Sequence, residues 1–317
     1  MSVIIPNWNG AQRLKALLLA LGSQQPIREV IVVDNGSSDD SVRVAQTAGV
    51  RVLARSVNSG FAVAVNEGVR AARSDWLLIL NNDVELTAGW LQTLYDAAMA
   101  RGAFFATGKL LHAADHRLID GTYDAVCRGG TAWRCGAGQP DGRRFEVERA
   151  IQFAPFTALL VRKAAFDRVG LLDERFESYL EDVDFGLRCA RIGLDGIFVP
   201  AAIGYHQGSA TLGRWHGDVV RRISRNQVLL AGKHFPIRYL WPILVAQGLW
   251  GLVSLRHGAF GAWVWGKIEG LWMLPQIHER SGLAAGILER SEMEIHGATD
   301  LYWKLYFRLT GSRRSRR

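Results

Sequence analysis

The sequence has few cysteines and lacks the marks of several protein classes. Its 317 residues include three cysteines, Cys127, Cys135 and Cys189, and no Cys-x-x-Cys spacing. This argues against a disulfide framework and against a zinc site, so we expect reduced, structural cysteines. No charged leader with a short apolar core opens the chain, because residues 2–6 already have the pattern of a strand. We therefore expect a cytoplasmic protein.

The sequence also lacks the glycine-rich loops that cradle phosphate groups. It contains no G-x-x-x-x-G-K-[ST] motif, and no G-x-G-x-x-G motif follows the first predicted strand. A cation held by carboxylate is the natural alternative device for binding a phosphorylated ligand.

Basic charge is concentrated in the last third of the chain. Residues 206–317 contain 16 basic and 7 acidic residues, a net charge of +9, whereas residues 1–205 have a net charge of −1. Basic residues interleaved with tryptophan suit an anionic membrane surface, which we expect as a partner. Nucleic acid is the competing partner, and the absence of a recognisable nucleic-acid module argues against it. The last third carries seven of the eleven tryptophans: Trp215, Trp241, Trp250, Trp263, Trp265, Trp272 and Trp303.

Short β-branched runs alternate with helical patterns along the first hundred residues. This rhythm predicts an α/β fold with a parallel sheet that is covered on both faces. The predicted strands are residues 2–6, 29–33, 50–54 and 76–80, and the predicted helices are residues 11–21, 41–48, 61–72 and 86–100.

Polar residues follow three of the predicted strands. They are residues 7–9, the pair Asp34-Asn35 and the run 81–83, which ends in a carboxylate. Each alone is commonly a turn or a helix cap. Ligands of such sheets bind beyond the carboxyl ends of the strands, so the three together predict one binding pocket.

Six motifs in order resemble the inverting family-two glycosyltransferases of the GT-A fold, in particular the rhamnosyltransferase-type branch. They are SVIIPNWNG, VIVVDNGSSDDS, NSGFAVAVNEG, LILNNDVEL, YLEDVDFGLRCARIG and YHQGSAT, and the resemblance covers residues 2–235. It implies a Rossmann-like nucleotide-sugar-binding half (1–100) fused to an acceptor-binding and catalytic half (101–235). A helical, basic, tryptophan-rich segment with a disordered tail (236–317) would follow.

The activity implied by the resemblance is transfer of a sugar, with rhamnose as one candidate, from a nucleoside-diphosphate sugar. The acceptor would be a hydroxyl of a glycan or lipid-linked molecule in cell-surface polysaccharide synthesis. The protein would work at the inner face of the cell membrane.

The resemblance also assigns residues that bind the nucleotide-sugar. Pro6, Asn7 and Asp34 would hold the nucleotide, and an aspartate can accept the imide N–H of uracil or thymine. The alternative for Asp34 is a cap on the following helix.

A second donor-binding stretch follows the pattern N-x-G-x-x-x-A-x-N. In this stretch Asn58, Gly60 and Asn66 would lie along the ribose and diphosphate, and Asn82 is also assigned to the donor. The alternative for Asn66 is a position facing the core.

Asp83 and His206 are the implied ligands of a divalent cation, Mg²⁺ or Mn²⁺. The cation would neutralise charge on the leaving nucleoside diphosphate. The family motif often reads Asp-x-Asp, whereas this chain reads Asn81-Asn82-Asp83. Because asparagine is a neutral and weaker ligand, we expect low metal affinity or a partial metal requirement.

Asp182 is the implied general base, and Glu181 would orient the acceptor or the donor sugar. Both fall in the first turn of a predicted helix, where acidic groups also favour the helix dipole without any catalytic role. The base would take the proton of the acceptor hydroxyl while its oxygen attacks the anomeric carbon, and one direct displacement inverts the configuration.

Two later regions have weaker patterns. Residues 121–142 contain six glycines and no periodicity, which predicts a mobile loop over the site. Residues 239–255 contain no charged side chain and residues 259–274 are amphipathic. These helices could lie on the membrane, pack as a soluble pair, or span the bilayer, for which 17 residues is the short limit.

Two rival functions fit parts of the sequence. A sugar-nucleotide pyrophosphorylase shares much of this fold, but it would have a basic, glycine-rich loop where this chain has residues 7–10. A non-catalytic nucleotide-sugar-binding or scaffold protein would explain the thinned Asn-Asn-Asp motif. The presence of Asp182, Glu181 and His206 together argues against it.

Overall fold

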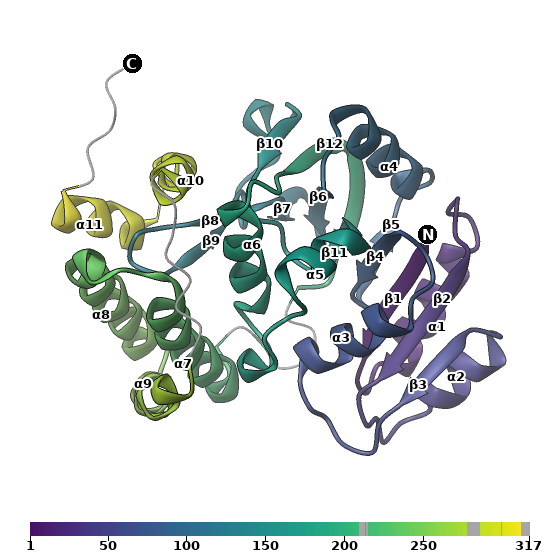
Figure 1. Ribbon diagram of the computed structural model, residues 1–317, viewed down its shortest axis with the longest axis horizontal. Helices are drawn as coiled ribbons and strands as arrows, with labels where there is room; N and C mark the ends of the chain where they lie inside the picture. The colour runs from purple at the N-terminus through teal and green to yellow at the C-terminus, as the bar shows by residue number, and fades with distance from the viewer. Residues whose placement is uncertain (209–212, 214, 278–285, 299, 312–317) are drawn as a thin grey trace. The chain divides into compact units, whose positions relative to one another are not determined.

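The computed structural model describes residues 1–208, 213, 215–277, 286–298 and 300–311, and these form two compact units (Figure 1). Unit 1 comprises residues 1–123 and 136–208, and unit 2 comprises residues 124–135 and 209–317. Most of the predicted basic tail, residues 312–317, lies outside the described residues.

Unit 1 is built around one large sheet with the strand order β10-β12-β6-β11-β4-β1-β2-β3, in which β5 also pairs with β12 and β7 with β6. Strands β1 to β4 are mutually parallel where they pair, and β11 runs antiparallel to β4. The strands are β1 (Ser2–Asn7), β2 (Glu29–Asp34), β3 (Arg51–Ala54), β4 (Trp76–Leu80), β5 (Val84–Leu86), β6 (Phe105–His112), β7 (Asp115–Gly121), β10 (Arg149–Ile151), β11 (Ala158–Arg162) and β12 (Gly196–His206).

Helices cover both faces of this sheet, as the continuous apolar strands require. Val3 and Ile5 point into a core shared with α1, α2 and α4. Ile4 points to the opposite face, where α3 approaches so closely that a side chain at Gly68 would collide with it. The helices are α1 (Ala11–Leu21), α2 (Ser41–Thr47), α3 (Phe61–Ala71), α4 (Trp90–Arg101), α5 (Lys163–Val169) and α6 (Glu181–Arg191), with 3-10 turns η1 (Arg143–Phe145) and η2 (Glu174–Phe176).

The predicted α/β rhythm of the first hundred residues is confirmed, with one correction. Leu86, the expected first residue of the fourth helix, is instead the last residue of strand β5, because residues 84–86 pair with β12. Helix α4 consequently begins at Trp90. The two predicted halves 1–100 and 101–235 are not separate units, since β6, β11 and β12 complete the sheet that β1 to β4 begin.

Residues 121–142 do not form the expected irregular loop. They contain a hairpin of β8 (Asp124–Val126) and β9 (Ala132–Arg134), which belongs to unit 2. The hairpin is tied to helix α10 (Ile287–Ile295) by a hydrogen bond from Val126 N to Ser291 Oγ (2.6 Å) and by an ion pair of Arg128 with Glu292 (2.9 Å). Partners 165 residues away leave no trace in local periodicity.

Unit 2 is otherwise helical, with α7 (Gly217–His234), η3 (Ile237–Tyr239), α8 (Leu240–Arg256), α9 (Phe260–Met273), η4 (Leu274–Gln276), α10 and α11 (Leu301–Thr310). Helix α9 packs closely on α7 because it presents glycine, and a side chain at Gly270 would lie 2.8 Å from the carbonyl of Arg225. Ion pairs also join α9 to α7, since Glu269 of α9 pairs with Arg221 (2.7 Å) and with Arg225 (3.1 Å) of α7.

Both apolar segments predicted near residues 240–273 are helices, as expected. Among the described residues, none of the helices combines the length and the apolarity needed to cross a bilayer. The three cysteines are free and buried, which agrees with the structural role expected of them.

Candidate active site

The polar residues that follow β1, β2 and β4 meet, as the sequence predicted. Asn7 Nδ2 donates a hydrogen bond to Asp34 Oδ1 (3.0 Å), and Asn82 Nδ2 donates to Asn7 Oδ1 (2.7 Å). Pro6, one residue earlier, is buried within β1 opposite Val33 of β2. The ends of three strands are thus joined through the amide of Asn7, which is 3% exposed.

Asp34 closes the turn after β2. Its carboxylate accepts hydrogen bonds from the backbone N–H (2.9 Å) and the hydroxyl (2.6 Å) of Ser37, in addition to the bond from Asn7. Asp34 does not cap the following helix, because the N-cap of α2 (Ser41–Thr47) is Asp40 and the bonds of Asp34 to Ser37 lie within the preceding turn. Contact between Asp34 and a nucleotide stays a prediction.

Asn35, which the sequence placed in the predicted pocket without a role of its own, makes three hydrogen bonds to the segment before α3. Its Nδ2 donates to Asn58 Oδ1 (2.9 Å) and to the carbonyl of Gly60 (3.0 Å), and its Oδ1 accepts from the N–H of Ser59 (3.0 Å). The signal was its place directly after Asp34 at a strand end. Asn35 thereby fixes the segment that leads into α3.

Gly60 brings this segment against the loop that precedes α6. Its φ of 89° lies in the region that favours glycine, and an added Cβ would lie 2.8 Å from the carbonyl oxygen of Glu177. The N–H of Ala62 donates to that same carbonyl (2.8 Å), and the N–H of Phe61 donates to Ser178 Oγ (3.2 Å). The predicted donor-binding motif and the predicted catalytic segment therefore touch.

The loop before α6 has a strained backbone. Glu177, Tyr179 and Leu180 have φ values of 57°, 73° and 66°, and such values are uncommon in residues other than glycine. Strain of this kind concentrates at functional sites, where the surrounding contacts hold it in place. The strain ends directly before Glu181, the first residue of α6.

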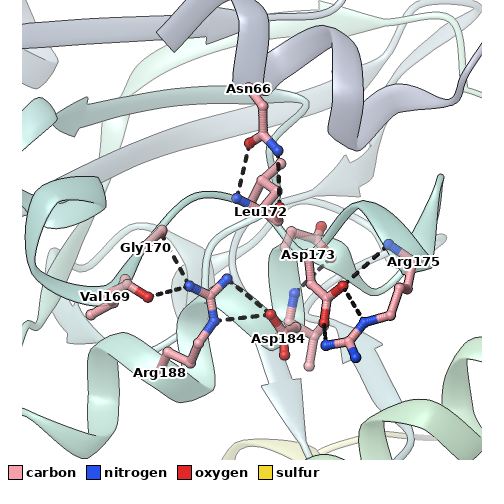
Figure 2. A network of polar contacts seen from close by, with 10 residues as sticks. Asn66, Val169, Gly170, Leu172, Asp173, Arg175, Asp184 and Arg188 are labelled. Atoms are coloured by element: carbon pink, nitrogen blue, oxygen red, sulfur yellow. Dashed lines mark hydrogen bonds and ion pairs between the residues drawn. The ribbon is translucent and has the colours of Figure 1, made fainter. Parts of the chain in front are cut away.

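Three carboxylates lie in the first turn of α6, as predicted for two of them. Glu181 is 5% exposed and Asp184 is fully buried. Asp184 pairs with Arg188 (2.9 Å), and Arg188 also donates to the carbonyl of Val169 (2.6 Å), so this pair has a structural role (Figure 2). Asp182 is the partly exposed member, and its Oδ1 accepts a hydrogen bond from the N–H of Val183 (2.8 Å).

Asn66 occupies an interior position rather than the expected place along the donor. Figure 2 shows its amide facing the backbone of Leu172, where Nδ2 donates to the carbonyl and Oδ1 accepts from the N–H, both at 2.9 Å. Its Nδ2 also contacts Glu174 Oε1 (2.9 Å). Because Leu172 takes up both ends of the amide, Asn66 holds α3 to the chain that leads into α6.

Asp83 and His206 lie side by side, as predicted for a cation site. Oδ1 of Asp83 is 3.3 Å from Nε2 of His206, and both residues are largely buried. Burial alone would raise the pKa of Asp83, but its contact with His206 outweighs that effect and lowers the pKa. Burial alone would lower the pKa of His206, because it disfavours the charged imidazolium. The contacts with Asp120 and Asp83 outweigh this effect and raise the pKa of His206 to about 9.

The Asp83 and His206 pair offers two adjacent ligand positions. Oδ1 of Asp83 is buried and, among the described residues, has no partner with hydrogen-bond geometry. Two ligands about 2.1 Å from one ion and at right angles to each other stand about 3 Å apart, close to the 3.3 Å observed. The described residues contain no group of three or more His, Cys, Asp or Glu side chains that could enclose a metal. The residues therefore fit a cation that takes its remaining ligands from phosphate and water.

Asp120 completes this cluster, and no motif in the sequence pointed to it. Its Oδ2 lies 2.7 Å from Nδ1 of His206, on the side of the ring away from Asp83. Asp120 is on β7, next to the segment that we expected to be a loop.

Comparison with known proteins agrees with this arrangement. Residues 2–170, more than half of the chain, match the family described as glycosyl transferase family 2. The chain is 30% identical over 220 residues to an N-acetylglucosaminyl-diphospho-decaprenol L-rhamnosyltransferase of Mycobacterium tuberculosis, a match that covers 62% of this chain and 71% of the relative. It is 27% identical over 220 residues to a pre-mycofactocin glycosyltransferase of the same species, covering 68% of this chain and 44% of that one.

Solved structures share the fold at low sequence identity. GalNAc-T7 with UDP, GalNAc and Mn²⁺ superposes with a TM-score of 0.61 at 14% identity, over 88% of this chain and 58% of that one. The mannosyltransferase PcManGT of Pyrobaculum calidifontis in complex with GDP-Man and Mn²⁺ superposes with a TM-score of 0.52 at 17% identity, over 98% and 83%. The mixed sheet of unit 1 is thus the GT-A-like sheet of these enzymes. With the strand-end network, the α6 carboxylates and the family match in agreement, the chain belongs to glycosyl transferase family 2 and is a glycosyltransferase related to an L-rhamnosyltransferase.

Proposed function

We propose that this glycosyltransferase inverts the anomeric centre and that Asp182 is its general base. The observation that carries this is the difference in exposure among the first-turn carboxylates of α6: Glu181 and Asp184 are buried, whereas Asp182 is partly exposed. A general base must reach the acceptor hydroxyl, so the partial exposure of Asp182 supports this residue over its two buried neighbours. Buried Glu181 is assigned to orienting the acceptor or the donor sugar.

The strand-end network is the donor-binding side of the proposed site. Pro6, Asn7 and Asp34 would face the nucleotide, with Asn58, Gly60 and Asn82 along the ribose and diphosphate. Apart from Pro6, these residues are joined by one set of hydrogen bonds through Asn7 and Asn35, in which the N–H of Asn35 donates to the carbonyl of Asn7 (2.8 Å). Such a network holds binding groups in place before the ligand arrives, which reduces the entropy lost on binding.

Asp83 and His206 would hold one divalent cation, Mg²⁺ or Mn²⁺. When bound, the cation supplies neutralisation of the charge that develops on the leaving nucleoside diphosphate. Both structural neighbours contain Mn²⁺, which supports this assignment. The motif lacks a second aspartate, and the amide of Asn82 donates to Asn7. We therefore expect weak binding of the cation by the protein alone.

The sugar and the acceptor are proposed from the names of similar proteins. Rhamnose on a uridine or thymidine diphosphate is the first donor to test, since the relative from Mycobacterium tuberculosis is named as an L-rhamnosyltransferase. The name of that relative also contains N-acetylglucosaminyl-diphospho-decaprenol, which makes a lipid-linked sugar acceptor in cell-surface polysaccharide synthesis the first acceptor to test.

We further propose that unit 2 docks on the cytoplasmic face of an anionic membrane. Exposed apolar residues recur at helical spacing along η3 and α8, and we call this set the apolar stripe. Arg238 and Arg256, both exposed, lie at its two ends, where they can meet lipid phosphates. The stripe consists of Ile237, Trp241, Leu244, Leu252 and Leu255, each more than half exposed.

A donor screen tests the transferase proposal. The full chain in mild detergent would be incubated with nucleotide-sugars and Mn²⁺, with and without EDTA, and assayed for released nucleoside diphosphate. We expect slow release from one donor, lost with EDTA and absent in the Asp182→Asn variant. Release that persists in EDTA would show that the reaction does not need a cation. Donor binding without turnover under any condition would favour a non-catalytic sugar-nucleotide-binding protein.

A further inference from the structure

The ring of His206 is held between two carboxylates, one at each nitrogen. Nε2 faces Oδ1 of Asp83 at 3.3 Å, and Nδ1 faces Oδ2 of Asp120 at 2.7 Å. The shorter contact has hydrogen-bond geometry, and the carboxylate can only accept, so Nδ1 carries the proton. The two nitrogens therefore have different tasks.

A β-bulge directs Asp120 to this position. Leu110 of β6 is paired with Gly121 of β7, but the next residue, Leu111, is paired with Ile119. Asp120 is the extra residue between them. Bulges commonly re-aim a side chain beside an active site, and here the re-aimed side chain reaches His206 of β12, which flanks β6 as well.

The chain after His206 leaves room for this carboxylate. Gly208 follows two residues later, and a Cβ there would lie 2.8 Å from Oδ1 of Asp120. Any other residue at this position would crowd the carboxylate. The small residue in the Tyr-His-Gln-Gly motif thus serves the contact between Asp120 and His206.

We propose that Asp120 is a positioning residue of the cation site: its hydrogen bond to Nδ1 fixes the ring of His206 so that the lone pair of Nε2 points to the space beside Asp83. Metal-bound histidines commonly donate their second ring N–H to a carboxylate in this way, which sets the tautomer and the ring orientation. The inference rests on the cation site of the proposed function. Asp120 itself would not touch the ion.

Measurement of Mn²⁺ binding to the full chain without donor, by electron paramagnetic resonance of free Mn²⁺, tests this role. We expect Asp120→Ala to raise the dissociation constant by about 10- to 100-fold. Asp120→Asn should have a smaller effect, because its carboxamide oxygen still accepts from Nδ1. Asp115→Asn is the matched control on the same strand, since Asp115 pairs with exposed Arg117, and it should leave Mn²⁺ affinity unchanged.

Asp83→Asn separates failure of this inference from failure of the cation site. If it abolishes Mn²⁺ binding while both Asp120 variants stay within twofold of the wild type, Asp120 is not a positioning residue and the cation site stands. If Asp83→Asn binds Mn²⁺ normally, the ion sits elsewhere and both ideas fall. Thermal unfolding in EDTA identifies any variant that is misfolded, and the near-isosteric Asp120→Asn carries the test if Asp120→Ala does not fold.

Discussion

The two units place polar and apolar groups in opposite ways. In unit 1 the polar side chains gather at the ends of strands and are joined by hydrogen bonds into one site. In unit 2 the ion pair of Arg225 with Glu269 joins α7 to α9, while many large apolar side chains face outward. Of the nineteen large apolar side chains that are exposed among the described residues, thirteen belong to unit 2.

This difference supports the proposal that the two units bind different ligands. A charged, phosphorylated donor needs oriented polar groups that are already in place. An exposed apolar stripe with basic ends has no use in binding such a donor, but it suits the boundary between lipid headgroups and acyl chains. Variants that impair one unit and leave the other unchanged test whether the two units have separate roles.

The largest effect is expected in unit 1 from Asp182→Asn. Removing the proposed base should lower turnover by about 10²- to 10⁴-fold, since positioned proton transfer contributes on that order. Donor affinity, measured by calorimetry, and vesicle binding through unit 2 should not change. Turnover equal to that of the wild type would show that Asp182 is not the base.

Asn66→Ala should destabilise unit 1 without any loss of donor contacts. The substitution leaves the buried N–H and carbonyl of Leu172 without their partner, which we expect to cost about 2–4 kcal/mol in the free energy of unfolding. Urea denaturation measures the change. Gln92→Ala, at a hydrogen-bonded but exposed position on α4, is the control and should have little effect.

Stability of the metal-free protein should fall as the pH rises through 9. The pKa of His206 is raised from 6.5 to about 9 in the folded state, so folding binds a proton between these values. The stabilisation is complete below pH 6.5 and is lost as the pH passes 9, with a size of roughly 1–3 kcal/mol. Urea denaturation in EDTA from pH 6 to 10 would show this slope, and His206→Gln should flatten it. An equal slope in that variant would assign the effect to another group.

The smallest effect is expected from single changes in the apolar stripe of unit 2. Trp241→Ser removes an indole ring that is 59% exposed, so it should weaken binding to anionic phosphatidylglycerol vesicles by roughly tenfold while folding is unchanged. Sedimentation with the vesicles measures the change. Leu19→Ser, at a 74% exposed position in unit 1, is the matched control. Equal effects of the two changes, or no vesicle binding by the wild type, would contradict the docking role.

Local pattern was enough to predict the first hundred residues of the fold. The alternation of strands and helices follows from short-range hydrophobic periodicity. Polar residues at the strand ends meet because the carboxyl ends of parallel strands lie at one edge of the sheet. Pairings between distant segments were not predictable in this way. The fourth helix was expected to begin at residue 86, but residues 84–86 pair with β12 as a strand. Residues 121–142 lack periodicity, but their hairpin is held by α10.

Three features could be predicted from the sequence: the α/β pattern, the positions of Asn7 and Asp34 at strand ends, and the position of Asp182 in the first turn of a helix. Each of them depends on near neighbours along the chain. The tertiary structure alone decided that Asn66 is structural and that Asp120 faces His206. Those contacts join residues 106 and 86 positions apart, and they depend on a bulge and a buried backbone segment that no local pattern encodes.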